Sequence, residues 1–420
     1  MATTPRRNPI LTIFLTVFLD LLGVTIIIPI LAPLLKEPDG LLAASVLDGT
    51  RNEIYGYLVA VFPFCQFLSA PLLGSMSDKW GRRPVLFTSL FVTLTGYLLF
   101  AYGVEIRSLW LLFVGRSLSG LAAGNLSVIY SAVADISTPE AKARNFGLVG
   151  VAFGVGFVVG PAIGGLLAND ELLPWLSYAT PFLFSAALVL LNLALVYFRF
   201  PETHANPNPE TSISPWAGFA NLKKAFTSPA LRTIFVTLFM FTFGFAFFTQ
   251  FIQIYLIDKF LFDEKDIGIL FSYLGVVIAL TQGGLVRYLS SRFAPVPILA
   301  FSLGMLVIAY LLLLVPDTTL GLYAAVPFVA IAQGMATPNL SALLSNSVEA
   351  RLQGETLGMQ QSVRAMGQLL PPVIGGYAVT MALAFPIWLA AASTVVAWLV
   401  FLSYYVLRRP GRVVPPTEHE

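Results

Sequence analysis

The chain has few charged residues for its size. Asp, Glu, Lys and Arg make up 11% of its 420 residues, whereas soluble globular domains carry about 25%. Hydrophobic residues make up 57%, and the mean hydropathy is +0.81. A soluble protein of this size cannot hide so much apolar surface, because its outside must be wetted. The composition therefore predicts an integral membrane protein with the lipid bilayer as its solvent.

Residues that would support several other functions are also scarce. The single cysteine, Cys65, excludes an intrachain disulfide, and the only two histidines are His204 and His419. No cluster of His, Asp or Glu indicates a metal site or a membrane enzyme, and the nucleotide-binding pattern GxxxxGK[ST] does not occur. The net charge of +2 is too small to indicate a nucleic-acid partner. We therefore expect no enzymatic activity, no cofactor and no metal.

Apolar runs that are long enough to cross a bilayer recur along the chain. A crossing helix needs about 20 such residues, so we expect an all-α membrane protein with twelve transmembrane helices. The first six spans are Ile10–Leu35, Ile54–Met76, Pro84–Tyr102, Leu109–Val133, Asn145–Ala168 and Trp175–Phe198. The second six are Leu231–Ile257, Ile267–Leu289, Pro295–Val315, Leu320–Asn346, Thr356–Leu383 and Pro386–Leu407.

A segment of different composition separates the two sets of spans. Residues 201–230 are rich in Pro, Asn and Ser and end in a basic amphipathic stretch, which is typical of a linker. We therefore expect an N-terminal half (1–200), a linker (201–230) and a C-terminal half with a tail (231–420). With the N-terminus in the cytoplasm, 17 of the 24 Lys and Arg residues lie on the cytoplasmic side and five in external loops, as the positive-inside rule requires. Both termini are then cytoplasmic.

The two halves carry matching sequence fragments. GPAIGG in the fifth span and PPVIGG in the eleventh place Pro161 and Pro372 211 residues apart, and Gly74 and Gly284 in the second and eighth spans are 210 apart. Equal offsets at two places indicate a duplication into two pseudo-symmetric six-helix halves. Parallel repeats of this kind are the design of a large class of transporters, with a binding site between the halves near mid-membrane.

One acid lies deep in the first span. Asp20 stands in the apolar run LDLLGVTIIIPILAPLL (19–35), roughly 20 Å, or nearly four helical turns, beyond Arg7. An ionised carboxylate at the bilayer centre costs about 2.5–3.5 kcal/mol on insertion scales, and such acids are usually functional. Asp20 therefore faces the bundle interior, where it is suited to carry a proton. The alternative is a fixed ion pair or a hydrogen bond between helices.

Four motifs resemble the major facilitator superfamily. GSMSDKWGRRP (74–84) resembles its loop motif GxxxDxxGRR, RSLSG (116–120) its fourth-helix motif RxxxG, and GVGFVVGPAIGG (154–165) its fifth-helix antiporter motif. The pattern of Asp20, Gly23, Pro29 and Pro33 is similar to the first helix of drug:proton antiporters, notably tetracycline exporters. Tetracycline exporters also carry a histidine in the eighth span and an acid in the ninth, and this chain has neither.

The resemblance implies roles for two groups of residues. The first is a gating loop, in which Asp78 pairs with cations when the cytoplasmic gap between the halves is closed. Small residues of the fifth span form the second group, a helix-five seal that holds the halves together in one state. The gating loop comprises Gly74, Asp78, Gly81, Arg82 and Arg83. The helix-five seal comprises Gly154, Gly156, Gly160, Pro161, Gly164 and Gly165.

Two arginines also lie within predicted spans. Arg116 is near mid-depth, and the resemblance implies that it lines the cavity with Asp20 and takes part in proton coupling; the alternative is packing between spans. Arg364 belongs to a polar stripe in the eleventh span, which either lines the cavity or, as we favour, bonds to the gating loop. The polar stripe comprises Gln360, Gln361, Arg364 and Gln368.

A substrate cavity between the halves is expected from the same resemblance. Aromatic surface with few polar anchors suits a lipophilic, even cationic, ligand. The candidate lining residues are Ser127, Tyr130, Phe243, Gln250 and Gln253. We expect a monomeric, proton-coupled exporter of small amphiphilic compounds in the bacterial inner membrane, working by alternating access. The alternative is a uniporter or proton symporter of a metabolite in the same fold.

Overall fold

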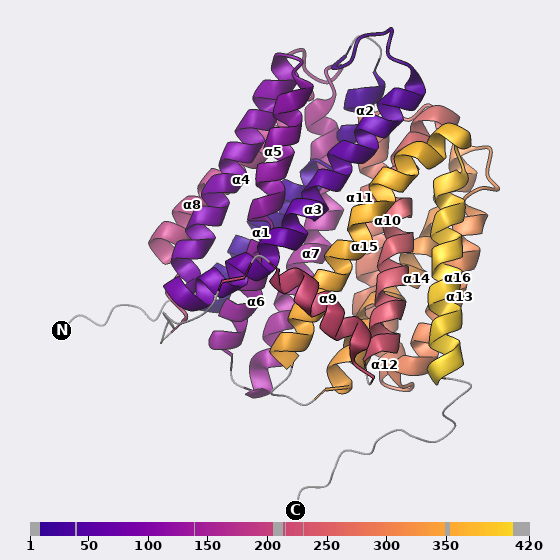
Figure 1. Ribbon diagram of the computed structural model, residues 1–420. Coiled ribbons are helices and arrows are strands. Elements are labelled where there is room, and N and C mark those ends of the chain that lie inside the picture. Colours follow the sequence, from indigo (N-terminus) through magenta and orange to yellow (C-terminus); the bar gives the residue numbers. More distant parts are fainter. Residues whose placement is uncertain are drawn as a thin grey trace, which may run out of the picture.

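A computed structural model describes residues 9–405 except 38–39, 138, 205–212, 215, 230 and 349–352. The described chain is a bundle of long helices, with the N-terminal half on one side and the C-terminal half on the other (Figure 1). Each half has its own apolar core: one cluster of buried side chains comes mainly from residues 13–200 and the other mainly from residues 225–401.

The N-terminal half contains eight helices that make six spans. Breaks in the first and fourth spans account for the two additional helices. The helices are α1 (Pro9–Ile26), α2 (Leu31–Lys36), α3 (Asp48–Trp80), α4 (Arg82–Glu105), α5 (Leu109–Ala122), α6 (Asn125–Asp135), α7 (Pro139–Ala168) and α8 (Thr180–Arg199). Pro29 lies in the first break, where a residue without a backbone N–H cannot continue the helix.

The C-terminal half also makes six spans and follows the linker helix α9 (Ala217–Thr227). Its eighth span changes from an α-helix to a π-helical turn at Gly283 and Gly284, and then back. The elements are α10 (Arg232–Phe260), α11 (Glu264–Leu280), η1 (Thr281–Val286), α12 (Arg287–Ser290), α13 (Pro295–Leu312), α14 (Thr319–Asn346), α15 (Gln353–Met381) and α16 (Phe385–Tyr405).

Twelve spans result, as the sequence predicts. Within the described residues, ten helical segments are long and apolar enough to cross a membrane. The other two spans are α7, whose described apolar part is Gly154–Ala168, and α15, which contains the polar stripe. The expectation of an all-α membrane protein with twelve helices in two halves is confirmed.

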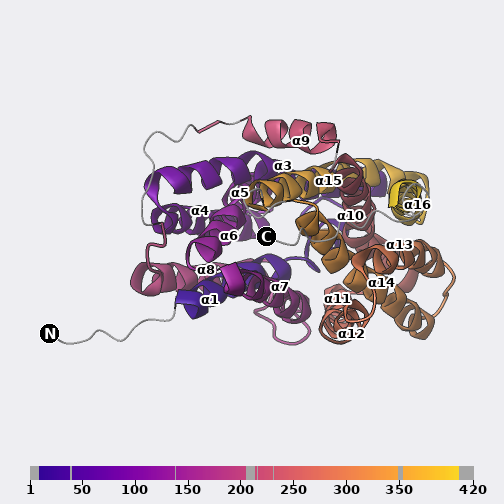
Figure 2. The ribbon, with the colours of Figure 1, turned by 90° about the horizontal axis from the view of Figure 1, so that it is seen from below.

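The linker helix α9 lies across both halves. Seen from below, it runs along the outside of α3 and α15 (Figure 2). The ring of Phe219 packs edge-on against Phe67 of α3, with centroids 5.0 Å apart, and Asn221 donates a hydrogen bond to Ser362 of α15 at 3.4 Å. We call the side of the molecule where α9 lies the linker face, and the opposite side, where α2 lies, the distal face.

Candidate functional site

The two halves are joined at the distal face. Lys36 of α2 forms an ion pair with Asp258 of α10 at 3.0 Å, and the hydroxyl of Tyr55 on α3 donates to the backbone carbonyl of Gln250 on α10. The backbone N–H of Ala162 on α7 donates to Ser272 of α11 at 3.0 Å. Because these bonds come from several different helix pairs, they close the distal side of the interface.

Helix-five seal residues lie in this closed region. A Cβ atom built on Gly165 would collide with the backbone carbonyl of Glu264, and one on Gly268 of α11 would collide with that of Pro161. Within the N-terminal half, Gly160 and Gly164 allow the same closeness between α7 and α1, and the Thr25 hydroxyl donates to the Gly156 carbonyl at 2.9 Å. Glycine is needed because backbones touch.

A second seal is formed by α3 and α15. A Cβ on Gly56 would collide with the carbonyl of Pro372, and one on Gly376 would lie 2.9 Å from the carbonyl of Asn52. The fifth span meets the eighth and the second meets the eleventh, so the two contacts are related by the same pseudo-symmetry as the sequence repeat. Equivalent small residues therefore close both sides of the distal interface.

Toward the linker face the same helices have open space beside them. A Cβ built on Gly154 of α7, or on Gly283 or Gly284 of η1, would meet no atom within 4 Å. Among the glycines of the helix-five seal, only Gly154 has no atom within 4 Å of an added Cβ. The described contacts therefore close the distal face, and these three glycines take part in no equivalent contact toward the linker face.

Asp20 lies beside α6 in the N-terminal half. The Asn125 amide donates to one carboxylate oxygen at 3.3 Å, and Tyr97 of α4 is within electrostatic range of the Asp20 carboxylate. Gly23, one turn along α1, packs near the same tyrosine, since a Cβ there would be in ordinary van der Waals contact with the Tyr97 ring at 3.6 Å. Among the described ion pairs none involves Asp20, so its described side-chain partner is the neutral amide of Asn125.

Arg116 is close to this group but does not pair with Asp20. Its guanidinium lies over the Phe62 ring, 4.6 Å from the centroid, and its buried Nε has no hydrogen-bond partner among the described residues. Tyr97 and Tyr55 are within its electrostatic range. Tyr97 is therefore near both Asp20 and Arg116, and the three side chains form a polar group inside an apolar half.

The polar stripe of α15 faces residues of both halves. Arg364 and Gln360 both donate to the Ser341 hydroxyl of α14, at 3.4 and 3.1 Å. Tyr130 of α6, in the other half, is within electrostatic range of Arg364. No described contact joins Arg364 to the gating loop in this conformation, so both alternatives for the polar stripe stay predictions. Gln361 is partly buried and Gln368 is exposed.

The gating loop is tied together within the N-terminal half. Arg82 forms an ion pair with Asp78, donates through Nε to Asp135 of α6 at 3.0 Å and donates to Ser77 at 2.7 Å. Gly81 has a φ of 98°, in the region that favours glycine. Glu202 accepts hydrogen bonds from the backbone N–H groups of Arg82 and Arg83.

These bonds connect the ends of several helices. Arg83 donates to the carbonyl of Tyr197 on α8, and a Cβ on Gly74 would lie 3.5 Å from Ser127 of α6. The carboxylate of Asp78 is used inside its own half, with no described partner from the C-terminal half. In the described residues the Asp78 carboxylate therefore does not join the two halves.

The remaining cavity candidates have different surroundings. Ser127 donates to the Ala70 carbonyl of α3 at 2.9 Å, so it joins two helices of one half. On α10, Phe243 is partly buried, and the side-chain oxygens of Gln250 and Gln253 are buried without a described partner. The two glutamines therefore retain unused acceptors at the interface between the halves.

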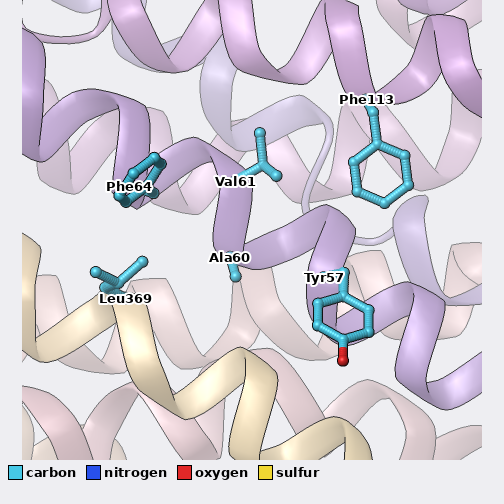
Figure 3. A pocket seen from close by; sticks show the side chains of 6 residues that line it. All are labelled: Tyr57, Ala60, Val61, Phe64, Phe113 and Leu369. Carbon is cyan, nitrogen blue, oxygen red and sulfur yellow. The ribbon is translucent and has the colours of Figure 1, made fainter.

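A separate apolar crevice lies where α3, α5 and α15 meet (Figure 3). Its volume is about 360 Å³, and its lining residues are Tyr57, Ala60, Val61, Phe64, Phe113 and Leu369. Tyr57 and Phe64 are 40% and 46% exposed, which places the crevice at the surface of the bundle. It has no charged lining residue, so it offers no means of proton coupling.

Comparison with known proteins identifies the family. The family model described as Major Facilitator Superfamily matches residues 13–372, most of the chain. The chain belongs to the major facilitator superfamily. It is therefore a membrane transporter and not an enzyme, which confirms the expectation from the motifs.

Curated relatives of this transporter place it in the drug:proton antiporter branch. It is 31% identical over 419 residues to the class C tetracycline resistance protein of Escherichia coli, a match that covers 96% of each chain. It is also 26% identical over 405 residues to multidrug resistance protein 1 of Bacillus subtilis (strain 168), with 95% of this chain and 97% of the relative covered.

Solved structures share the fold of this transporter at lower identity. The crystal structure of the human organic anion transporter MFSD10 aligns with a TM-score of 0.72 and 21% identity, over 95% of this chain and 100% of that one. A D-xylose–proton symporter aligns with a TM-score of 0.74 and 16% identity, over 93% and 96%. These likenesses establish the arrangement of the helices.

Several contact residues of this transporter were not found by sequence reasoning. Asn125 was not among the candidates, yet its side-chain amide donates to Asp20. Asp135 and Glu202 were missed as partners of the gating loop. Both are acids at helix ends close to the predicted cytoplasmic boundary, and that position was the available signal.

Arg82 forms ion pairs with two carboxylates, those of Asp78 and Asp135, which leads to a first prediction. Lysine carries one point charge and cannot donate through Nε and Nη to Asp135 and Asp78 at once. We expect Arg82→Lys to lower transport at least tenfold, about 1.4 kcal/mol, in an uptake assay with inverted membrane vesicles. Lys79→Ala, which removes a charge from the same loop, should retain transport; equal losses in both variants would contradict a specific role for Arg82.

Proposed function

We propose that this transporter is a proton-coupled exporter of small amphiphilic compounds in the bacterial inner membrane. The observation that carries the proposal is Asp20, the one acid in the interior of a span, held by an amide and unpaired with any described cation. A carboxyl group that is surrounded by apolar helices can stay there in its neutral form, and it needs water or a partner in its charged form. Such a group is suited to take up and release a proton.

The linker face is the cytoplasmic face in this proposal. The excess of Lys and Arg in the segments on that side supports the orientation, and both termini are then cytoplasmic. The conformation described above is then open to the cytoplasm and closed to the outside. This is the state in which an exporter would load its substrate.

Transport would proceed by exchange between this state and one that is open at the distal face. Opening of the distal face would break the Lys36–Asp258 pair and separate α7 from α11. Asp20 would bind a proton from the outside in that state and release it to the cytoplasm after the return. Because Arg116 does not pair with Asp20, the carboxyl group would be free to change its charge in each cycle.

The gating loop and the helix-five seal would control access from opposite sides. Asp78 is paired with Arg82 in the cytoplasm-open state and would gain a partner from the C-terminal half when that side closes. The seal residues would prevent proton leakage, because backbones in contact leave no room for water. The transporter would act as a monomer, since each half supplies one wall of the cavity.

Transport assays with one purified protein test the proposal. In proteoliposomes with an imposed pH gradient, a panel of amphiphilic dyes and antibiotics should accumulate against its gradient, and a protonophore should abolish the accumulation. Addition of a transported compound should also release protons, recorded with a pH-sensitive dye. Gradient-independent equilibration of all compounds would overturn proton coupling and support the alternative, a uniporter.

A further inference from the structure

The polar stripe on α15 has more hydrogen-bond donors than acceptors. Arg364 and Gln360 both donate to one oxygen, the Ser341 hydroxyl. The Nε of Arg364 is buried and has no partner among the described residues. A guanidinium has five N–H groups and no acceptor, and the described side-chain hydrogen bond to Ser341 uses one of them. No carboxylate in the described part of the chain forms an ion pair with Arg364.

The group formed by Arg364, Gln360 and Ser341 lies at the boundary between the two halves. Tyr130 of the N-terminal half is within electrostatic range of Arg364. One turn along α15, a Cβ on Gly367 would lie 3.3 Å from the backbone carbonyl of Phe239 on α10. The rings of Phe239 and Phe243 are 5.6 Å apart, and both side chains are partly buried. An apolar, aromatic surface therefore begins within about one helical turn of the guanidinium.

The charges inside the bundle do not balance. Arg116 is a second guanidinium, and its buried Nε also has no described partner. The one acid at this depth, Asp20, is held by Asn125 and pairs with neither arginine. A charge taken out of water is unfavourable unless a counter-charge compensates it. Two cations and one acid therefore leave room for one more negative charge in the cavity.

We propose that the cavity binds the anionic group of an amphiphilic substrate, a carboxylate or a sulfonate, at Arg364, Gln360 and Ser341. The apolar body of the substrate packs on Phe239 and Phe243. A guanidinium and an amide present N–H donors in a geometry that suits the oxygens of such an anion. Phenylalanine rings alone would accept a cation equally well, so the arginines determine that the charge on the substrate is negative. The inference deepens the proposed function, on which it rests for the transport step.

A consequence for charge movement follows. If one proton enters while one monovalent anion leaves, two positive charges in effect move inward in each cycle. If one proton enters while one monovalent cation leaves, no net charge moves. A membrane potential that is negative inside therefore drives the export of the anion even without a pH gradient. The charge of the substrate can thus be measured separately from proton coupling.

Two dyes with the same three-ring body and opposite charge provide the test. Fluorescein carries a carboxylate and is anionic at pH 7.5, whereas rhodamine 6G is an ester and is cationic. Fluorescence anisotropy with the purified full chain in a neutral detergent measures binding without lipid phosphate as a competitor. We expect the wild type to bind fluorescein at least tenfold more tightly than rhodamine 6G.

Variants then assign the site. Arg364→Gln should weaken fluorescein binding at least tenfold, about 1.4 kcal/mol, and leave rhodamine 6G binding unchanged or tighter. Arg364→Lys keeps the positive charge but lacks the planar guanidinium, so its affinity for fluorescein should lie between those of the wild type and Arg364→Gln. The matched control is Arg292→Gln, which removes a cation stacked on Tyr288 near the linker face and should change neither dye.

The outcomes separate this inference from the proposed function. Tighter binding of rhodamine 6G by the wild type would overturn the inference, as would equal fluorescein binding by the wild type and Arg364→Gln. If rhodamine 6G is exported under a pH gradient and a potassium–valinomycin potential has no effect, the exporter stands and the anionic substrate is wrong. If fluorescein binds at Arg364 and no gradient drives its transport, the exporter function fails and the binding site stands. Should Arg364→Gln not fold, the ranking of the dyes by the wild type and by Gln360→Ala decides.

Discussion

Replacement of Asp20 by asparagine is expected to abolish proton-driven transport. Aspartate and asparagine have nearly the same shape, and the new side chain keeps an oxygen that can accept the bond from Asn125, now 3.3 Å long. The substitution removes the titratable proton and little else. In energised inverted vesicles, accumulation should fall to the level of vesicles without the transporter, while protein yield and dye binding in detergent remain within about threefold of the wild type, about 0.7 kcal/mol.

Two controls separate loss of a proton site from loss of a charge. Asp20→Glu retains a carboxyl group and should retain part of the coupled transport. Asp317→Asn removes a carboxylate at the distal face, where the side chain is 88% exposed and pairs with Lys259, and this variant should transport as the wild type does. Full accumulation by Asp20→Asn would remove this carboxyl group from the mechanism, and the twelve-helix architecture would be unaffected.

The number of spans was predictable because the thickness of a bilayer sets the length of a crossing helix. The ends of the spans were less predictable. α3 begins at Asp48 and ends at Trp80, whereas the apolar run is Ile54–Met76. Helices continue past the hydrocarbon core as long as their backbone bonds are made, and hydropathy does not record where that stops. The linker helix α9 appeared in the sequence only as a basic amphipathic stretch.

Breaks inside spans had a larger effect on the candidate site. The sequence predicted the fourth span as one continuous helix over Leu109–Val133, but α5 ends at Ala122 and α6 begins at Asn125. Asn125, the first residue of α6, donates a hydrogen bond to Asp20. No proline marks this position, so tertiary packing decides where the helix is interrupted. A close contact supports this, since a Cβ on Gly124 would lie 2.6 Å from the Ser69 hydroxyl oxygen.

Partners that are distant in the sequence could not be assigned by motif. The gating loop was recognisable from its spacing, yet Arg82 reaches Asp135, which is 53 residues away, and its backbone N–H reaches Glu202, which is 120 residues away. Arg364 donates to Ser341, a partner that no motif pointed to, and its expected bond to the gating loop stays a prediction. A motif identifies which residues are used, and the conformational state determines which partners they have.

Gly268→Ala is expected to shift the transporter toward its distal-open state. The added methyl group would collide with the Pro161 carbonyl and would lie 3.4 Å from the Gly165 Cα, both on α7. The collision exists where the two halves are in contact and disappears once they separate. Overpacking of this kind costs about 1–3 kcal/mol, which changes the ratio of two states about 5- to 150-fold. Transport should fall correspondingly, because the cytoplasm-open state is then rarely populated.

The shift can be measured as a distance across the distal face. Spin labels at positions 47 and 320, on a background with Cys65→Ser, replace side chains that are 77% and 83% exposed and belong to different halves. Double electron–electron resonance should show a longer distance in Gly268→Ala than in the parent.

Gly283→Ala is the matched control, since it lies in the same span with no atom within 4 Å of the new methyl group. Both variants gain the same helix propensity, about 0.5–1 kcal/mol, so a difference between them reports the contact between the halves. If Gly268→Ala lost transport while the distance between the spin labels stayed unchanged, the glycine would serve packing alone. A methyl group that obstructs closure of the distal interface must lengthen that distance if the interface opens and closes in each cycle.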